Sequence, residues 1–260
     1  MNYHSIKIID FYFFSGTGNT LLVVKKMKEV FERNDITVNL YHLEKTNPKE
    51  INTAHTIGLG VPVAEQGTFP LVWDFVKNMP QANGTIIFMV DTMMMFSGGI
   101  VGPIRKILKP KGYKPIGARE ICMPNNLFPG KIDEKKNKEK VRKGLNRAEK
   151  YAEDILCGRS RWRRVPVLSD FMGYFSKADW AWRSLRKHYL LIINKEKCIQ
   201  CGLCESLCPV DNITINNYPE FQGSCTICMR CVSFCPKKAI ARIKTKHEIY
   251  RAVNVKELID

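Results

Sequence analysis

Residues 198–209 read Cys-Ile-Gln-Cys-Gly-Leu-Cys-Glu-Ser-Leu-Cys-Pro, and residues 225–236 read Cys-Thr-Ile-Cys-Met-Arg-Cys-Val-Ser-Phe-Cys-Pro. Three thiolates at this spacing can each reach a different iron of one cubane, while the fourth cysteine lies too far round and ligates the other cluster. The repeated pattern therefore predicts two [4Fe–4S] clusters. The first cluster takes Cys198, Cys201, Cys204 and Cys235, and the second cluster takes Cys225, Cys228, Cys231 and Cys208.

Zinc sites and disulfides explain these cysteines less well. A zinc site uses four cysteines in two pairs, which leaves the third cysteine of each triplet without a role. A disulfide framework belongs to oxidising compartments. About 50 residues here resemble the bacterial two-cluster ferredoxins, which implies a small α+β domain with a pseudo-twofold βαβ pair and low-potential one-electron transfer. The other two cysteines, Cys122 and Cys157, stand alone, and we interpret them as buried apolar residues.

The composition is that of a globular chain. Apolar residues make up 45% and charged residues 25% of the 260 residues, which excludes disordered and fibrous classes. No apolar run approaches the roughly 18 residues of a membrane span, so we expect no transmembrane segment. The first residues lack the features of a secretory signal, which favours a reducing, cytoplasmic location.

Residues 1–157 alternate between strand and helix patterns. Strand-like apolar segments lie at 7–14, 36–43, 56–63, 85–90 and 113–123, and helical spacing of apolar residues lies at 21–33, 70–79, 100–108 and 133–156. Strands that alternate with helices form right-handed βαβ units, which build a parallel sheet. We therefore predict an α/β, doubly wound, five-stranded parallel sheet.

The first predicted strand is followed at once by Ser15-Gly16-Thr17-Gly18-Asn19-Thr20 and then by a helix. Ligands bind at this position in open α/β sheets, beside a helix N-terminus. Hydroxyl and backbone N–H groups can surround a phosphate there, and two glycines allow the chain to curl tightly. The loop is neither a P-loop nor a dinucleotide fingerprint. The remaining interpretations are a phosphomonoester site, which FMN fits, and a polar turn without a ligand.

A more specific resemblance starts from this loop, which looks like the phosphate loop of flavodoxins. Together with Met123-Pro124-Asn125-Asn126 and Gly98-Gly99, it resembles the fused flavodoxin–ferredoxin proteins of anaerobes, known as the EFR family. The resemblance covers most of the chain and implies a flavodoxin-like domain with strand order 2-1-3-4-5 that carries FMN. It also implies that the FMN phosphate is bound by Ser15, Gly16, Thr17, Gly18, Asn19 and Thr20.

The sequence departs from flavodoxins where aromatic side chains usually enclose the flavin ring. The later loop at 91–99 carries methionines at Met93–Met95 instead. We expect the cofactor to be bound there by Thr92, Met93, Phe96 and Gly98, with a thioether packed on the ring or Phe96 stacked on it. We also expect hydrogen bonds from Asn125 and Asn126 to the pyrimidine edge of the flavin. The alternatives are that the methionines fill the core and that the asparagines form a turn after Pro124.

A basic, aromatic bridge over residues 158–194 joins the predicted domains 1–157 and 195–260, and we expect residues 244–260 to form a polar tail. Residues 131–195 hold 18 basic and 8 acidic residues, so this part carries 18 − 8 = +10 of the net charge of +16. One interpretation is a docking face for an acidic redox protein, and another is a helix on a membrane surface. A third is a packing segment whose arginines remain solvated. No motif supports nucleic acid, so we do not expect it as a partner.

These features predict an electron-transfer protein that passes electrons between FMN, two [4Fe–4S] clusters and an external redox partner. A flavin holds one or two electrons and each cluster passes one, so the combination converts between two-electron and one-electron transfer. One alternative is a flavin-dependent reductase of a small-molecule substrate, fed by the clusters. The other is a ferredoxin whose flavodoxin-like domain is empty and binds a partner.

Overall fold

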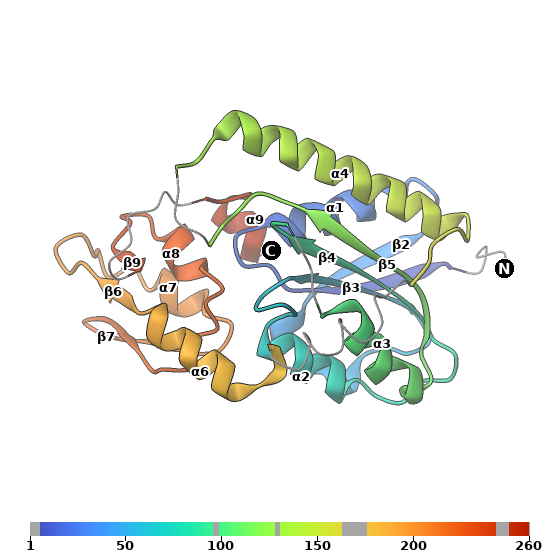
Figure 1. The fold of residues 1–260 in the computed structure, drawn as a ribbon, viewed down its shortest axis with the longest axis horizontal. Coiled ribbons are helices and arrows are strands. Elements are labelled where there is room, and N and C mark those ends of the chain that lie inside the picture. The colour runs from blue at the N-terminus through green and yellow to red at the C-terminus, as the bar shows by residue number, and fades with distance from the viewer. Residues whose placement is uncertain (1–5, 96–98, 128–130, 163–175, 243–249, 260) are drawn as a thin grey trace.

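A computed structural model describes residues 6–95, 99–127, 131–162, 176–242 and 250–259. The N-terminal unit is built on five parallel strands in the order β2-β1-β3-β4-β5 (Figure 1). The strands are β1 Ile8–Phe13, β2 Thr37–His42, β3 Thr56–Pro62, β4 Ile86–Met93 and β5 Lys114–Cys122. This is the predicted doubly wound sheet, in the order that the flavodoxin-like fold requires.

Within the described ranges, four helices cover the two faces of the sheet, and three short 3₁₀ turns lie in the connections. Figure 1 shows α1 and α4 on one face and α2 and α3 on the other. The helices are α1 Asn19–Glu32, α2 Pro70–Asn78, α3 Val101–Leu108 and α4 Glu134–Leu156, and the turns are Leu43–Lys45, Pro48–Glu50 and Lys109–Lys111. All four helices lie where the apolar spacing predicts them.

The alternation of side chains along the strands divides the core into two layers. On β4, Phe88 and Val90 are buried in the layer under α1 and α4. The neighbouring Ile87 and Met89 are buried in the layer with α2 and α3. A central strand that is apolar at successive positions is the expected pattern for a parallel sheet covered on both faces.

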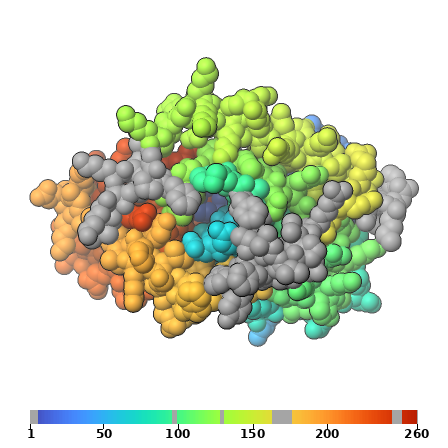
Figure 2. Space-filling view, in the orientation of Figure 1, coloured from blue at the N-terminus to red at the C-terminus, as the bar shows by residue number. Residues whose placement is uncertain are grey.

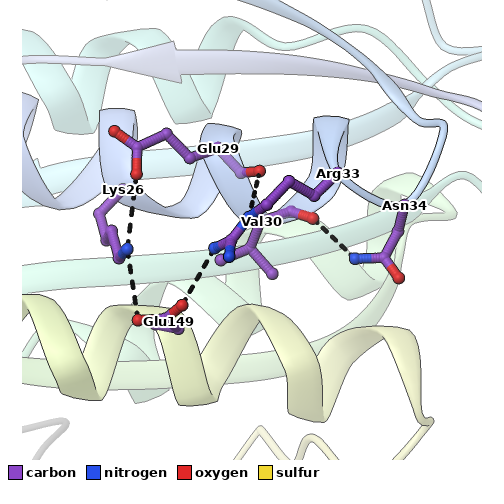
Figure 3. Close-up of polar contacts among 6 residues, drawn as sticks. All are labelled: Lys26, Glu29, Val30, Arg33, Asn34 and Glu149. Carbon is purple, nitrogen blue, oxygen red and sulfur yellow. Dashed lines mark hydrogen bonds and ion pairs between the residues drawn. The ribbon is translucent and has the colours of Figure 1, made fainter.

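Ion pairs at the surface join α1 to α4. The Glu149 carboxylate of α4 lies 3.3 Å from Lys26 Nζ and 3.0 Å from Arg33 Nη2, both on α1 (Figure 3). The two cations lower the pKa of Glu149, mainly through hydrogen bonds from Arg33 and Lys26. Exposed pairs of this kind add little stability, so the buried layer under α1 and α4 is what holds them together.

The C-terminal unit is a small α+β structure with two antiparallel ladders. Strand β6 pairs with β9, and β7 pairs with β8. Its elements are β6 Leu191–Ile193, α7 Leu203–Ser206, β7 Ile213–Asn216, β8 Tyr218–Phe221, α8 Arg230–Phe234 and β9 Ile240–Arg242. A separate apolar cluster that includes Ile213, Val232 and Ile240 forms its core.

The bridge is described at residues 158–162 and from residue 176 onward, and it contains α6 Asp179–His188. Trp182 is buried and donates its Nε1–H to the Ser176 carbonyl oxygen over 2.9 Å, whereas Trp180 is 53% exposed. Trp162 is buried on the N-terminal unit and donates to the Val101 carbonyl oxygen over 3.0 Å. Trp162 and Trp182 are therefore packed in the protein interior, as the packing interpretation of the bridge predicts.

Two expectations are corrected. Residues 244–260 read as a polar tail, but Val255–Ile259 form helix α9, and Leu258 is buried against α1 and its layer. In Figure 1 this helix returns to the side of α1. Cys157, expected to be buried, is exposed at the end of α4, and Cys122 is half-buried. None of the helices within the described ranges is both long and apolar enough to cross a membrane.

Candidate functional site

The loop between β1 and α1 is shaped by its glycines. Gly18 has a φ of 101°, in the left-handed region that favours glycine. A Cβ atom on Gly16 would lie 2.4 Å from the carbonyl oxygen of Cys228, so only glycine allows this approach. Within the described part of the chain, the backbone N–H groups from Gly16 to Thr20 donate no hydrogen bond. The loop therefore presents a row of free donors at the N-terminus of α1, which suits an anion.

Three of the predicted residues lie outside the loop. Thr92 and Asn126 contact side chains of the loop, whereas Asn125 forms a turn. The hydroxyl oxygens of Thr20 and Thr92 lie 2.8 Å apart. Asn126 Nδ2 donates to Thr17 Oγ1 over 3.0 Å, which leaves the Thr17 hydroxyl hydrogen available. Asn125 instead accepts from the backbone N–H of Leu127 over 3.0 Å, which is the turn-forming role.

A pocket with about 850 Å³ of empty space opens over this loop, and we call it the loop pocket. In Figure 2, blue atoms of the early chain are visible deep in a hollow between cyan and orange atoms. The predicted residues that line the pocket are Ser15, Gly16, Thr17, Asn19, Thr20, Thr92, Met93, Asn125 and Asn126. Phe96 and Gly98 lie outside the described residues.

The far wall of the loop pocket comes from parts of the chain that the sequence did not connect with it. Trp182, Leu185 and Tyr189 of the bridge line it, as do residues 226–229 between the second-cluster cysteines. Phe69 lines it from the start of α2. Among the described residues, the pocket thus has three aromatic lining side chains, and two of them, Trp182 and Tyr189, come from the bridge. Such a wall formed by distant segments leaves no local sequence signal.

The C-terminal unit contains two further hollows, each lined by one predicted set of cysteines. The first-cluster hollow is lined by Cys198, Cys201, Cys204 and Cys235. The second-cluster hollow is lined by Cys208, Cys225, Cys228 and Cys231. The structure therefore brings together the two crossed sets that the spacing predicts, with the fourth cysteine of each motif in the other set.

Within each set, neighbouring thiols also raise one another's pKa. Burial raises the pKa of Cys204, and the nearby thiols of Cys201 and Cys235 raise it further. Burial raises the pKa of Cys225, and Cys208 adds to this effect. Buried thiols this close resist ionisation unless a cation compensates, and iron in a cluster supplies that charge. The donor sets thus fit [4Fe–4S] clusters. Among the described residues, no three His, Cys, Asp or Glu side chains converge as a single-ion site.

Cys228 connects the two halves of the site, because it lines both the loop pocket and the second-cluster hollow. The pKa of its thiol is raised to about 11, because the effect of burial outweighs the opposing effect of the nearby Arg230 guanidinium. The second cluster therefore adjoins the loop pocket, whereas the first-cluster hollow shares no lining residue with it.

A buried acid lies beside the site. Asp91 on β4 precedes Thr92, is fully buried, and finds no hydrogen-bond partner for either carboxylate oxygen among the described residues. Burial raises its pKa well above the usual range, and the nearby Glu120 raises it further. Burial therefore favours the protonated form of Asp91 over a wider pH range than in an exposed aspartate.

Comparisons with known proteins support the cluster assignment. Two family models, both described as 4Fe-4S binding domain, match residues 191–214 and 222–238. The polyferredoxin protein MvhB of Methanothermus fervidus is 39% identical over 54 residues, which cover 20% of this chain and 13% of that protein. The uncharacterized ferredoxin MJ0155 of Methanocaldococcus jannaschii is 38% identical over 56 residues, which cover 19% of this chain and 36% of that protein. The chain thus spans only a small part of these relatives.

Solved flavodoxins are similar to the N-terminal unit. A flavodoxin from the domain Archaea is 19% identical, with a TM-score of 0.39, and the match covers 55% of this chain and 97% of that one. The flavodoxin of Megasphaera elsdenii is 18% identical, with a TM-score of 0.41, and the match covers 54% and 98%. The fold itself is defined by the observed strand order. The chain thus joins a flavodoxin-like unit to a region of 4Fe–4S binding domains, which is an arrangement for iron–sulfur electron transfer.

Proposed function

We propose that this protein carries one FMN and two [4Fe–4S] clusters and transfers electrons between them and an external redox partner. The observation that carries the proposal is the position of Cys228, which borders both the loop pocket and the second-cluster hollow. The two spaces also share Tyr189, Thr226, Ile227 and Met229 as lining residues, so they adjoin closely enough for electron exchange without movement of the two units. FMN, when bound, supplies a carrier of one or two electrons, and each cluster supplies a one-electron carrier.

The residues of the loop pocket have separate roles in this proposal. The N–H groups from Gly16 to Thr20 and the hydroxyls of Ser15, Thr17 and Thr20 bind the phosphate, and all of these residues except Gly18 line the loop pocket. Thr92 orients Thr20, Asn126 orients Thr17, and Met93 lines the space for the ring. The bridge aromatics on the far wall exclude water from that space. The eight motif cysteines hold the irons as thiolates, which requires a reducing compartment such as the cytoplasm.

We place the external partner at the first cluster. Cys201 is exposed there, and the neighbouring Ile199 is 55% exposed. The exposed lysines around these ligands are Lys195, Lys197, Lys237 and Lys238. This basic edge favours an acidic redox protein, since complementary charge accelerates encounter. On the bridge, by contrast, Arg183 already pairs with Asp179 over 3.2 Å.

A reductase is the second candidate, because the loop pocket is open to solvent and is lined by Met93 and Met94 as well as by Phe69. A small-molecule substrate would then bind over the flavin and accept electrons from it. Rapid reoxidation of the reduced flavin by one compound of a substrate panel, at a rate above that of free FMN, would favour this function over a pure carrier.

The test of the proposed function is a count of iron, sulfide and FMN in protein purified without oxygen. We expect about eight irons and one FMN per chain, since ligand identity and count are the checkable properties of such sites. Eight irons with no FMN uptake would mean that the flavodoxin-like unit is empty and serves only to bind a partner.

A substitution in the loop tests whether FMN binds there. Thr17→Glu places a carboxylate where the phosphate is expected, so FMN affinity should fall at least tenfold while the iron content stays the same. Thr37→Glu, at an exposed threonine on β2, is the matched control and should bind FMN like the unmodified protein. Equal FMN affinity in both variants would contradict the assignment of the loop.

A further inference from the structure

Arg230 is a buried cation inside the second cysteine motif. It begins α8 between Cys228 and Cys231, and only 5% of the residue is exposed. Its Nε donates to the carbonyl oxygen of Ser15 over 2.9 Å, at the start of the phosphate-loop segment. The guanidinium carbon also lies 4.8 Å from the centre of the Phe14 ring, within the range of a cation–π contact.

A second bond of Arg230 reaches the other motif. Its Nη1 donates to the carbonyl oxygen of Leu207 over 3.4 Å, directly before the second-cluster ligand Cys208. One guanidinium therefore contacts the loop that we assign to FMN and backbone next to the fourth ligand of the second cluster. A planar, five-donor fork suits this multiple contact, which lysine does not reproduce.

The charge of Arg230 is balanced from the N-terminal unit. Its Nη2 lies 2.6 Å from Glu44 Oε1, and both side chains are 6% exposed. His42 Nδ1 lies 3.6 Å from the same oxygen. A buried pair of this kind costs free energy when only one partner is removed, because an unpaired charge then remains inside. The pair therefore joins the N-terminal unit to Arg230, which itself lines the second-cluster hollow.

From this arrangement we propose that Arg230 is a positioning residue that holds the second cluster against the flavin site, and that the Arg230–Glu44 pair sets the reduction potential of the second cluster selectively. Reduction adds negative charge to a cluster, so a nearby cation raises its potential and a nearby carboxylate lowers it. The first cluster should respond less to the pair, because among the described residues no hydrogen bond or ion pair joins Arg230 to a first-cluster ligand, whereas Arg230 bonds the residue before Cys208. This inference rests on the proposed function.

Opposite shifts test the proposal. In the holoprotein, a redox titration followed by electron paramagnetic resonance measures each cluster, with the first cluster identified by a Cys201→Ser ligand variant. Glu44→Gln should raise the potential of the second cluster, and Arg230→Met should lower it, with the first cluster changed less in both. Arg251→Met, at an exposed cation on the C-terminal segment, is the control for a general loss of positive charge and should move neither.

The positioning role has its own readout. Arg230→Met should weaken FMN binding to the holoprotein by about tenfold, since a charged hydrogen bond to the loop is lost. If Arg230→Met fails to assemble clusters, the double variant Arg230→Met with Glu44→Met removes both charges and leaves neither unpaired. We expect it to keep the unmodified potential at the second cluster while FMN binding stays weak.

The outcomes separate this inference from the function on which it rests. A second-cluster potential that is unchanged in Glu44→Gln, or equal shifts of both clusters, overturns the inference even when FMN and eight irons are present. A chain with eight irons that never binds FMN overturns the proposed function and the positioning role, while opposite shifts in the same protein would still support the potential-setting pair.

Discussion

At the scale of single residues, Asp91 makes a prediction about pH. Burial raises its folded-state pKa well above its usual value, so its contribution to stability is complete below the unfolded pKa and is lost as pH rises towards the folded pKa. The substitution Asp91→Asn removes this pH-dependent loss of stability, because an amide does not ionise. The melting temperature of the variant minus that of the unmodified protein should therefore grow from pH 5 to pH 8.

The control for this measurement is Asp74→Asn, whose side chain is 68% exposed on α2. Its melting temperature should differ from that of the unmodified protein by the same small amount at both pH values. If the Asp91→Asn difference stays constant or shrinks with pH, the carboxyl group is ionised in the folded protein and the burial argument is wrong.

Residue identities at the site were predictable where function depends on local spacing. The eight cysteines and the loop at 15–20 form short motifs, and the structure brings each set together. Arg230 was not predictable in this way, because its contact with Ser15 joins positions 215 residues apart. The same holds for Tyr250, whose hydroxyl donates to Asn19 Oδ1 over 3.0 Å.

At the scale of elements, the strands of the five-stranded sheet and the helices that cover it were predictable from the periodicity of apolar residues alone. The predicted helix at 70–79 is observed as Pro70–Asn78, and the predicted strand at 85–90 continues to Met93 as Ile86–Met93. The extension carries Thr92 and Met93 up to the loop pocket. Helix α9 escaped prediction because it is five residues long, too short to display a helical period.

Helix α9 makes the second prediction. Leu258 is 2% exposed, and the chain before it donates the Ala252 N–H to the Thr17 carbonyl oxygen over 2.8 Å. Leu258→Ala should destabilise the N-terminal unit by about 2–5 kcal/mol, as buried leucines do, and should speed hydrogen exchange in the loop at 15–20. Both effects are measurable by thermal unfolding and amide exchange of the whole protein.

Ile259 provides the matched control for α9, since it is the next residue and is 41% exposed. Ile259→Ala should leave the melting temperature and the exchange rates nearly unchanged. Equal effects of the two substitutions would indicate that α9 as a whole, and not the buried leucine, determines the order of the loop.

At the scale of the whole molecule, the second cluster is enclosed and the first is exposed. The second-cluster ligand Cys231 is buried, and Cys228 faces the loop pocket. The first-cluster ligand Cys201 is exposed, and the first-cluster hollow shares no described lining residue with the loop pocket. In the proposed function, this asymmetry would order the electron path as flavin site, second cluster, first cluster and partner. The partner would then contact the lysines beside the first cluster.

Charge reversal at that edge tests this order. Lys197 precedes Cys198, and Lys237 and Lys238 follow Cys235 and Pro236. The triple variant Lys197→Glu, Lys237→Glu, Lys238→Glu should slow electron exchange with a purified acidic plant-type ferredoxin by at least tenfold at low salt, because steering by complementary charge is lost. Stopped-flow absorbance measures the rate, and added salt should narrow the difference, since it screens exposed charges.

The matched control carries three reversals on α4: Lys135→Glu, Lys138→Glu and Lys143→Glu, all exposed. Both variants change the net charge of the chain by the same amount, so a difference between them reports the position of the charge. We expect the α4 variant to keep the rate within about twofold of the unmodified protein. If it slows exchange as much as the first-cluster variant does, only the overall charge matters and electrons have no preferred exit. A rate lost only on reversal of Arg183, Arg186 and Lys187 would instead move the docking face to the bridge.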